Sequence, residues 1–341
     1  MTAASERPNT ASRLRLPRLG FGASVIGGLF QRVDSESAQA TIAAALDGGI
    51  AYVDTAPHYG RGLSERRVGD ALRDRPDILL STKVGRLMIP DPGITDDRER
   101  DSFFSAMPFS PRYDYSGDGI LRSFEASLHR LGLARVGLLL VHDIGRMVHG
   151  DQHDHYWDQL TEGGGFAALE RLRDEGAIDG FGIGVNEIAV CQDAIRAAPL
   201  DAILLAGRYT LLEQAPLDAL FPECLAAGVT VIVGGPYNSG ILASGTRGGP
   251  AHYNYGDAPE DVVRRVRRME QIADEHGIPL AAAALQFPLA HPAVGCVLPG
   301  LRDATQVRQT LDWFELAIPA EFWAALRDEN LLRADAPLPQ R

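Results

Sequence analysis

The sequence predicts a single α/β domain built as a (β/α)8 TIM barrel. Eight short apolar runs alternate with eight amphipathic segments along the 341 residues. The apolar runs are continuously hydrophobic, as strands are when helices cover both faces of a parallel sheet. No compositional break or long Pro- or Ser-rich linker divides the chain. We therefore expect one barrel domain over residues 17–341 and a flexible N-terminal arm over residues 1–16.

The predicted elements follow one another in strict alternation. The strands are expected at residues 18–24, 50–56, 78–84, 136–143, 178–185, 202–209, 229–235 and 294–300. The helices are expected at residues 36–49, 64–74, 119–133, 166–176, 187–199, 216–228, 279–292 and 303–316. Most of these helices carry apolar residues three and four positions apart, and several end near a glycine, as helices commonly do.

A doubly wound open sheet is the alternative architecture. That fold requires a Gly-rich turn after its first strand, with the pattern G-x-G-x-x-G at the start of a helix. The glycines between Gly22 and Gly28 do not match this pattern, and no acidic residue follows at the expected distance. The barrel is therefore the favoured fold.

Two predicted connections are longer than ordinary loops. Residues 87–118 separate the third strand from its helix, and residues 144–165 follow the fourth strand. Long loops after barrel strands lie over the active face. We expect these two segments to form substrate walls or lids.

Composition limits the partners and the compartment. The net charge of −12 disfavours nucleic acid and anionic membranes, which require a basic face. No apolar run approaches the roughly 18 residues of a membrane span, and the N-terminus has no apolar signal core. Three scattered cysteines favour a reducing compartment over a disulfide framework or structural zinc. These features predict a cytoplasmic protein.

Polar residues gather where three successive strands end. Asp54 and Tyr59 follow the second predicted strand, Lys83 ends the third, and His142 and Asp143 end the fourth. The C-terminal ends of barrel strands converge on one pocket, and neighbouring strands lie about 4.8 Å apart. A buried lysine requires a partner, and Asp54 on the next strand is the natural one.

This arrangement predicts an acid/base centre. A nearby cation favours the phenolate form, so we expect Lys83 to lower the pKa of Tyr59. His142 could orient the same substrate oxygen, which would suit interconversion of a carbonyl and an alcohol. Lys83 is the only lysine among 33 basic residues, which reflects either a coding bias toward arginine or a need for a compact ammonium. His58 is at most a substrate contact.

The order and spacing of these residues resemble the catalytic tetrad of the aldo-keto reductases. The segment "VDTAPHYGRGLSERRVGDALR" is similar to that family's signature, and the resemblance extends over about residues 17–315. It implies a barrel of aldo-keto reductase type without a Rossmann module, with an extended nicotinamide cofactor across its C-terminal face. It also implies Tyr59 as general acid/base, Lys83 and Asp54 as tuning groups, and His142 as the substrate-orienting group.

Further segments resemble the aldose 1-dehydrogenase branch of that family. They are "RYDYSGDGILRSFEASLHRLGL", "LLLVHDI", "GIGVNE" and "GGPYNSGILASG". This branch implies oxidation of the anomeric hydroxyl of an aldose, of the L-fucose or D-threo-aldose type, to a lactone. Pyridoxal 4-dehydrogenase and a broad aldehyde or ketone reductase are alternatives within the family. A non-catalytic nicotinamide-binding barrel and a metal-dependent barrel hydrolase are alternatives of other classes.

The resemblance also implies where the cofactor binds. The turn at residues 234–240 would bring backbone N–H groups to a pyrophosphate, and residues 298–310 resemble the family's adenosine-binding segment. Gly300 and Gln306 stand where NADP-using relatives carry cations, and Asp303 is nearby, so we predict NAD over NADP, with Arg302 as the residue that could still reach a phosphate. Asn186 is the candidate for holding the carboxamide. The candidate contacts are Gly22, Ser24, Asp54, Asn186, Gly235, Pro236, Tyr237, Asn238, Ser239, Gly240, Gly300, Arg302, Gln306 and Gln309.

The histidine-rich segment from His149 to Asp158 could suggest a metal. No inward-facing ligand set accompanies it, so we expect a polar loop and no metal site. The expected partner is a small sugar, aldehyde or alcohol substrate. We expect a monomer or a weak homo-oligomer.

Overall fold

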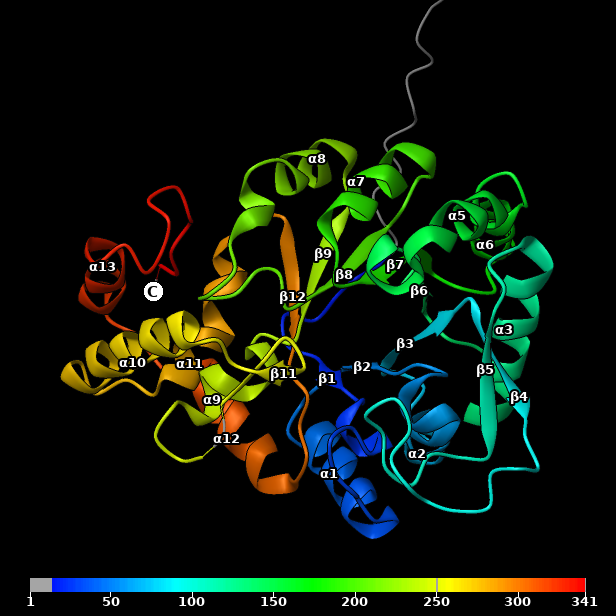
Figure 1. Cartoon of the computed structure of the whole chain (residues 1–341), viewed down its shortest axis with the longest axis horizontal. Helices are drawn as coiled ribbons and strands as arrows, with labels where there is room; N and C mark the ends of the chain where they lie inside the picture. The colour runs from blue at the N-terminus through cyan, green and yellow to red at the C-terminus, as the bar shows by residue number, and fades with distance from the viewer. Residues whose placement is uncertain (1–13, 250, 341) are drawn as a thin grey trace, which may run out of the picture.

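The computed structural model describes residues 14–249 and 251–340, and its strands form a closed parallel barrel (Figure 1). The order around the barrel follows the sequence. Parallel bridges from Leu19 to Val297 and from Gly22 to Gly300 join the first strand to the last. The strands are β1 (Phe21–Gly22), β2 (Tyr52–Asp54), β3 (Leu79–Val84), β6 (Leu138–His142), β7 (Gly180–Val185), β8 (Ala202–Ala206), β9 (Thr230–Gly234) and β12 (Val294–Leu298). The predicted (β/α)8 barrel is confirmed.

Alternate residues of the strands fill the barrel interior. The interior cluster consists of Tyr52, Leu138, Leu140, Ala202, Leu204, Ile232, Cys296 and Leu298. The opposite faces of the strands pack against the helices in a second, larger cluster. Both faces are therefore buried, which explains the continuously apolar strands. Leu14 and Leu16, at the end of the predicted arm, pack against the interior cluster, and residues 1–13 of the arm lie outside the described residues.

Helices surround the strands (Figure 1). Their bounds are α1 (Ser35–Asp47), α2 (Leu63–Leu72), α3 (Gly117–Leu131), α4 (Arg146–His149), α5 (His153–Leu160), α6 (Gly165–Asp174), α7 (Ile188–Ala197), α8 (Leu220–Ala227), α9 (Ile241–Ser244), α10 (Glu260–Glu275), α11 (Leu280–Gln286), α12 (Ala304–Glu315) and α13 (Ala320–Asp328). α10 is a helix beyond those predicted from the sequence, although Val262, Val266, Met269 and Ala273 are buried at helical spacing along it. No helix in the described part of the chain is both long and apolar enough to cross a membrane.

The two long segments have secondary structure of their own. β4 (Arg86–Pro90) and β5 (Phe109–Tyr113) form an antiparallel hairpin. This hairpin starts one residue before the predicted loop at residues 87–118 and otherwise lies within it. Residues 144–165 contain α4 and α5, so the expected polar loop at residues 149–158 is wrong. His153 and Leu160 are buried, and Tyr156 and Trp157 are half-buried. This spacing places one face of α5 against the barrel.

A second small hairpin, β10 (His252–Tyr253) and β11 (Gly256–Asp257), lies between β9 and α10.

Candidate active site

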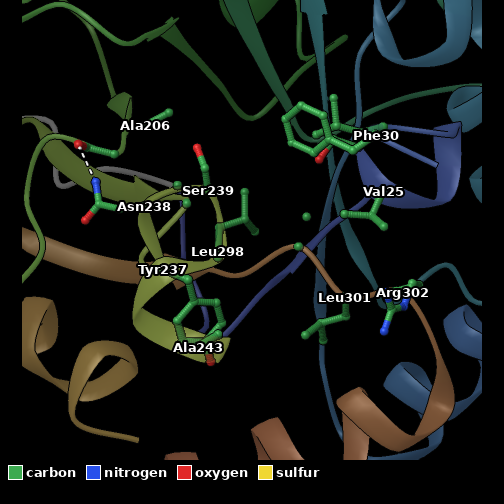
Figure 2. Close-up of a pocket in the computed structure, with 18 of the residues that line it drawn as sticks. Val25, Phe30, Ala206, Tyr237, Asn238, Ser239, Ala243, Leu298, Leu301 and Arg302 are labelled. Carbon is green, nitrogen blue, oxygen red and sulfur yellow. Dashed lines mark hydrogen bonds between the residues drawn. The ribbon is translucent and has the colours of Figure 1, made fainter. Parts of the chain in front are cut away.

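A pocket of about 620 Å³ opens at the C-terminal ends of the strands. Figure 2 shows Val25, Phe30 and Arg302 along one side and Tyr237 and Ser239 along the other. The lining extends from Tyr59 at one end to residues of α12 at the other, as an elongated ligand requires. All the candidate cofactor residues line this pocket except Pro236.

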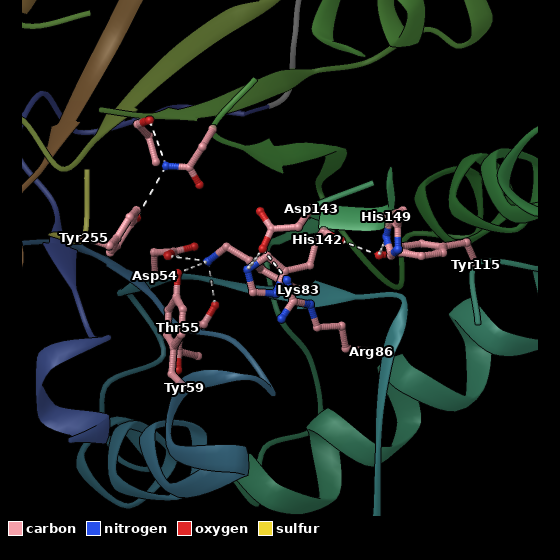
Figure 3. A network of polar contacts seen from close by, with 12 residues as sticks. Asp54, Thr55, Tyr59, Lys83, Arg86, Tyr115, His142, Asp143, His149 and Tyr255 are labelled. Atoms are coloured by element: carbon pink, nitrogen blue, oxygen red, sulfur yellow. Dashed lines mark hydrogen bonds and ion pairs between the residues drawn. The ribbon is translucent and has the colours of Figure 1, made fainter. Parts of the chain in front are cut away.

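Lys83 lies at the centre of the polar network beside this pocket (Figure 3). Its Nζ donates to Asp54 Oδ2 at 2.6 Å, to the Thr55 carbonyl at 3.0 Å and to Tyr59 Oη at 3.1 Å. The ammonium has three N–H donors, so this set of acceptors satisfies it completely. The side chains of Lys83 and Asp54 are each only 2% exposed. The pair that the sequence predicted is therefore present and buried.

Neighbouring residues of β2, β3 and β7 support the Lys83–Asp54 pair. Ser81 Oγ donates to Asp54 Oδ1 at 2.7 Å and also lies 2.8 Å from Tyr52 Oη. An ideal Cβ at Gly184 would lie 3.2 Å from Lys83 Cε, so glycine leaves room for the lysine stem. Ser81 and Tyr52 were not among the predicted site residues, although strand alternation places Ser81 on the same face as Lys83 and Tyr52 on the same face as Asp54.

Burial is the largest influence on the pKa of Tyr59. Desolvation raises the pKa of Tyr59 to about 12, while the Lys83 charge and hydrogen bond act in the opposite direction. The expectation of a lowered pKa is therefore wrong in the structure as described, because the cation only partly offsets burial. Burial alone would lower the pKa of Lys83, but Asp54 and Tyr59 raise it above its ordinary value.

His142 is a buried, neutral imidazole. Burial first, and then the charges of Arg86 and Lys83, lower its pKa well below the ordinary value. Its ring centroid lies 5.9 Å from that of Tyr59, and the two rings are perpendicular. The backbone carbonyl of His142 accepts a hydrogen bond from Tyr115 Oη at 2.7 Å, which fixes this end of β6. A neutral imidazole here can donate to a substrate oxygen near Tyr59.

Arg86 is a buried cation that the sequence analysis did not identify as a site residue. Its side chain is 5% exposed and donates from Nη2 to Asp143 Oδ2. The same carboxylate oxygen lies 3.5 Å from His142 Nε2. Burial raises the pKa of Asp143, although the charges of Arg86 and Lys83 oppose this shift. The end of β6 therefore contributes the carboxylate of an ion pair with Arg86 as well as an imidazole.

The segment between β4 and β5 returns to form an aromatic wall. Phe103 stacks on Tyr59 with ring centroids 6.0 Å apart, and it meets the edge of His58 at 5.3 Å. Burial, followed by the Arg86 charge, lowers the pKa of His58 to about 3. His58 lies 5.9 Å from His142 between ring centroids, so it is placed as a second neutral ring beside the reacting centre.

The turn after β9 is held by its own side chains. Asn238 is 3% exposed, accepts from Thr210 Oγ1 at 2.5 Å and donates to the Gly207 carbonyl at 3.2 Å. Its side chain therefore shapes the turn, and Asn238, Ser239 and Gly240 all line the pocket. Glycines at the pocket floor keep side chains away from a flat or phosphate-bearing ligand. The described residues thus fit a nicotinamide dinucleotide.

Comparison with known proteins identifies the family. The model of the aldo/keto reductase family matches residues 18–330. The chain belongs to this family. A pyridoxal 4-dehydrogenase of Microbacterium luteolum is 44% identical, and a D-threo-aldose 1-dehydrogenase of a Pseudomonas species is 37% identical. Each comparison covers 97% of this chain and 99% of the relative.

The fold agrees with this assignment. An aldo-keto reductase of Bacillus halodurans, in its holo form, superposes with a TM-score of 0.72 at 26% identity. The match covers 96% of this chain and 95% of the other. This aldo-keto reductase is therefore an oxidoreductase of a family that binds nicotinamide cofactors, and the metal-dependent hydrolase alternative is wrong. In the residues described, no group of three or more His, Cys, Asp or Glu is placed to hold a metal ion.

The far end of the pocket in this aldo-keto reductase is formed by the start of α12. Asp303 caps the helix by accepting from the backbone N–H groups of Thr305 and Gln306. Gln306 Oε1 in turn accepts from the Arg302 backbone N–H at 3.0 Å. The Arg302 guanidinium donates to Gln31 at 3.2 Å and lies 3.5 Å from Asp303. Arg302 is therefore partly neutralised where it meets the pocket.

The carboxamide candidate Asn186 lies beside the catalytic end. Its Nδ2 donates to the Ala206 carbonyl at 3.0 Å and lies 3.4 Å from Tyr255 Oη. Arg208 Nε donates to the Asn186 carbonyl at 2.6 Å, which anchors this residue from below. The Oδ1 atom of Asn186 forms no hydrogen bond to the described residues, so it is available to accept from an amide donor of a ligand.

Proposed function

We propose that this aldo-keto reductase oxidises the anomeric hydroxyl of a cyclic hemiacetal to a lactone with NAD. The observation that supports this most directly is the position of Tyr59 Oη, 3.1 Å from a fully paired Lys83 and at one end of an elongated pocket. Asp54 holds the ammonium in place, and the ammonium stabilises the phenolate form of Tyr59. Tyr59 is thus the proton acceptor for the substrate hydroxyl.

The other residues orient the substrate and exclude water. His142, as a neutral imidazole, donates a hydrogen bond to the reacting oxygen. Phe103 packs against the ring of Tyr59, and His58 packs against the ring of His142, so both limit access of water. Bound nicotinamide would supply the hydride acceptor, and its positive charge favours the Tyr59 phenolate further.

NAD is the preferred cofactor in this proposal. Gly300 provides no cation at the far end of the pocket, and Gln306 is engaged with the Arg302 backbone. Asp303 adds a negative charge next to Arg302, which disfavours a 2′-phosphate. Arg302 remains the residue through which NADP could still bind.

The first substrate candidate is an aldose of the L-fucose or D-threo-aldose type. A relative that is 37% identical is a D-threo-aldose 1-dehydrogenase, which supports this choice. Pyridoxal in its hemiacetal form is the second candidate. A 44% identical relative is a pyridoxal 4-dehydrogenase, and the Phe103 wall suits a flat aromatic ring.

A substrate panel tests the proposal. NADH formation is measured at pH 9 with L-fucose, L-galactose, D-arabinose and pyridoxal, with NAD and NADP in parallel, and the lactone is identified in the product. Tyr59→Phe should lose at least about 100-fold in kcat, because it removes the proton acceptor. Tyr156→Phe, which removes a phenol of α5 outside the pocket, should keep wild-type turnover.

Three outcomes would contradict parts of this proposal. Near-wild-type turnover by Tyr59→Phe would exclude it as the base. A higher kcat/KM with NADP would exclude the NAD preference. Binding of NAD without turnover of any aldose, pyridoxal, aldehyde or ketone would favour the non-catalytic barrel.

A further inference from the structure

Three buried polar atoms around His142 have no hydrogen-bond partner among the described residues. They are Arg86 Nε, His58 Nδ1 and His142 Nδ1. Buried polar side chains are normally satisfied, so three unpaired groups in one place indicate a region built for a ligand. Figure 3 shows Arg86 pointing toward His142 and Asp143.

Arg86 reaches this region because of the turn that precedes it. Gly85 has a φ of 95°, and it turns the chain between β3 and β4. An ideal Cβ at Gly85 would lie 2.3 Å from the Tyr115 ring, so only glycine allows this approach. The guanidinium then lies over Tyr113, with its Cζ 5.2 Å from the ring centroid. Arg86 is therefore held inside the site by the hairpin and kept from solvent.

The ion pair with Asp143 uses little of the hydrogen-bonding capacity of Arg86. A guanidinium has five N–H donors. Within residues 14–249 and 251–340, the Arg86 side chain forms one hydrogen bond, from Nη2 to Asp143. Leaving donors of a buried cation unpaired is costly unless a ligand accepts from them. The buried, unpaired Nε of Arg86 is therefore a donor for an acceptor oxygen of a ligand.

The geometry next to His142 limits which oxygen this is. Asp143 Oδ2 accepts from Arg86 Nη2 and lies 3.5 Å from His142 Nε2, so guanidinium and imidazole are neighbours. His142 is the group proposed to orient the reacting oxygen. The Arg86 guanidinium beside His142 would therefore donate to a substrate oxygen that is close to the hemiacetal carbon. Burial, and then the Arg86 charge, keep the pKa of His142 low, so Arg86 supplies the positive charge at this point.

We propose that Arg86 determines substrate specificity by donating to the oxygen substituent that flanks the hemiacetal group and is neither the hemiacetal hydroxyl nor the ring oxygen. In an aldose this is the 2-hydroxyl, and in pyridoxal it is the phenolate oxygen. The inference rests on the proposed hemiacetal oxidation and extends it, because it names the substrate group that the enzyme requires. Hemiacetals without such an oxygen are poor substrates.

A thermodynamic cycle tests this contact. The kcat/KM of the wild type and of Arg86→Gln is measured for L-fucose and 2-deoxy-L-fucose, and for pyridoxal and 3-deoxypyridoxal. Loss of the oxygen should lower wild-type kcat/KM about 10- to 100-fold, and Arg86→Gln should lose a similar factor on the parent substrate. On the deoxy substrates the two enzymes should differ by less than about threefold. The cycle cancels the intrinsic reactivity of each deoxy compound.

Control variants separate this contact from a structural role. Arg86→Gln leaves Asp143 without its cation, so Arg86→Gln/Asp143→Asn is measured beside it and should show the same loss of discrimination with a wild-type melting temperature. Arg171→Gln, an exposed arginine of α6, should behave as wild type.

Two results would overturn the inference in distinguishable ways. An equal loss on parent and deoxy substrates in both Arg86 variants would assign Arg86 a structural role and leave the proposed function intact. Failure of the wild-type enzyme to oxidise any of these hemiacetals would overturn the proposed function, and the inference with it.

Discussion

Replacing Lys83 by methionine should lower both stability and turnover, and for separate reasons. The variant leaves Asp54 with a side chain that is 2% exposed and without its cation, although Ser81 still donates to Oδ1. Removing one partner of a buried ion pair costs about 3–5 kcal/mol. With an unfolding entropy of about 2.1 cal/mol/K per residue over 341 residues, this cost corresponds to a melting temperature lowered by about 4–7 °C.

The loss of turnover arises at Tyr59. Lys83→Met removes the ammonium that donates to Tyr59 Oη at 3.1 Å. A hydrogen bond to a charged group contributes about 1.5–3 kcal/mol, which corresponds to about a 10- to 150-fold lower kcat. The pKa of Tyr59, already raised to about 12 by burial, should rise further, so the phenolate fraction at a given pH falls.

A second variant separates the two effects. Lys83→Met/Asp54→Asn removes both charges, so it should recover most of the melting temperature and none of the turnover. Scanning calorimetry and NADH formation at pH 9 measure the two quantities. Lys83→Arg keeps the charge but should also lose most turnover, because a planar guanidinium cannot serve three acceptors around one nitrogen. The reasoning is refuted if Lys83→Met melts within about 1 °C of the wild type or if the double variant regains turnover.

Three further predictions follow from the same structure. Because burial raises the pKa of Tyr59 to about 12, kcat/KM for oxidation should rise about tenfold per pH unit from pH 7 to 9, and a flat profile would exclude an ionising phenol. Gln306→Arg should raise the NADP-to-NAD ratio of kcat/KM about tenfold by adding a cation at α12, and an unchanged ratio would place the 2′-phosphate site elsewhere. Arg130→Met should destabilise the protein by about 3–5 kcal/mol, because it leaves the fully buried Glu65 without its cation and with only the Thr82 hydroxyl as a donor among the described side chains. Arg135→Met at an exposed pair should cost less than about 1 kcal/mol, and equal melting temperatures would contradict this.

Strand order and the positions of the tetrad could be predicted because they depend on local sequence patterns. Apolar runs at regular intervals determine where the strands lie, and the C-terminal end of a barrel strand faces the pocket regardless of side-chain detail. Asp54, Lys83 and His142 occupy such ends, so their meeting follows from topology alone. The partner of Lys83 followed for the same reason, since β2 and β3 are neighbours.

Properties that depend on long-range packing could not be predicted in this way. The pKa of Tyr59 depends on how much protein surrounds its hydroxyl, which includes Phe103 from a segment more than forty positions away. The Asp91-Pro92-Gly93 turn after β4 does not indicate that residues 109–113 return to pair with β4. Asn238 lines the pocket, but nothing in the local sequence indicates that Thr210 and Gly207, which follow a different strand, hold its amide.

The structure also bears on the single lysine. Lys83 and Arg86 are three positions apart, yet they meet different arrangements of acceptors. Three acceptors lie within 3.1 Å of one nitrogen at Lys83, and Gly184 leaves only enough space for a narrow stem. Arg86 places a flat fork between an aromatic ring and a carboxylate and leaves one edge unpaired. We therefore expect each position to require the shape of its own cation as well as the charge, and full activity of Lys83→Arg would instead attribute the lysine that remains to a coding bias toward arginine.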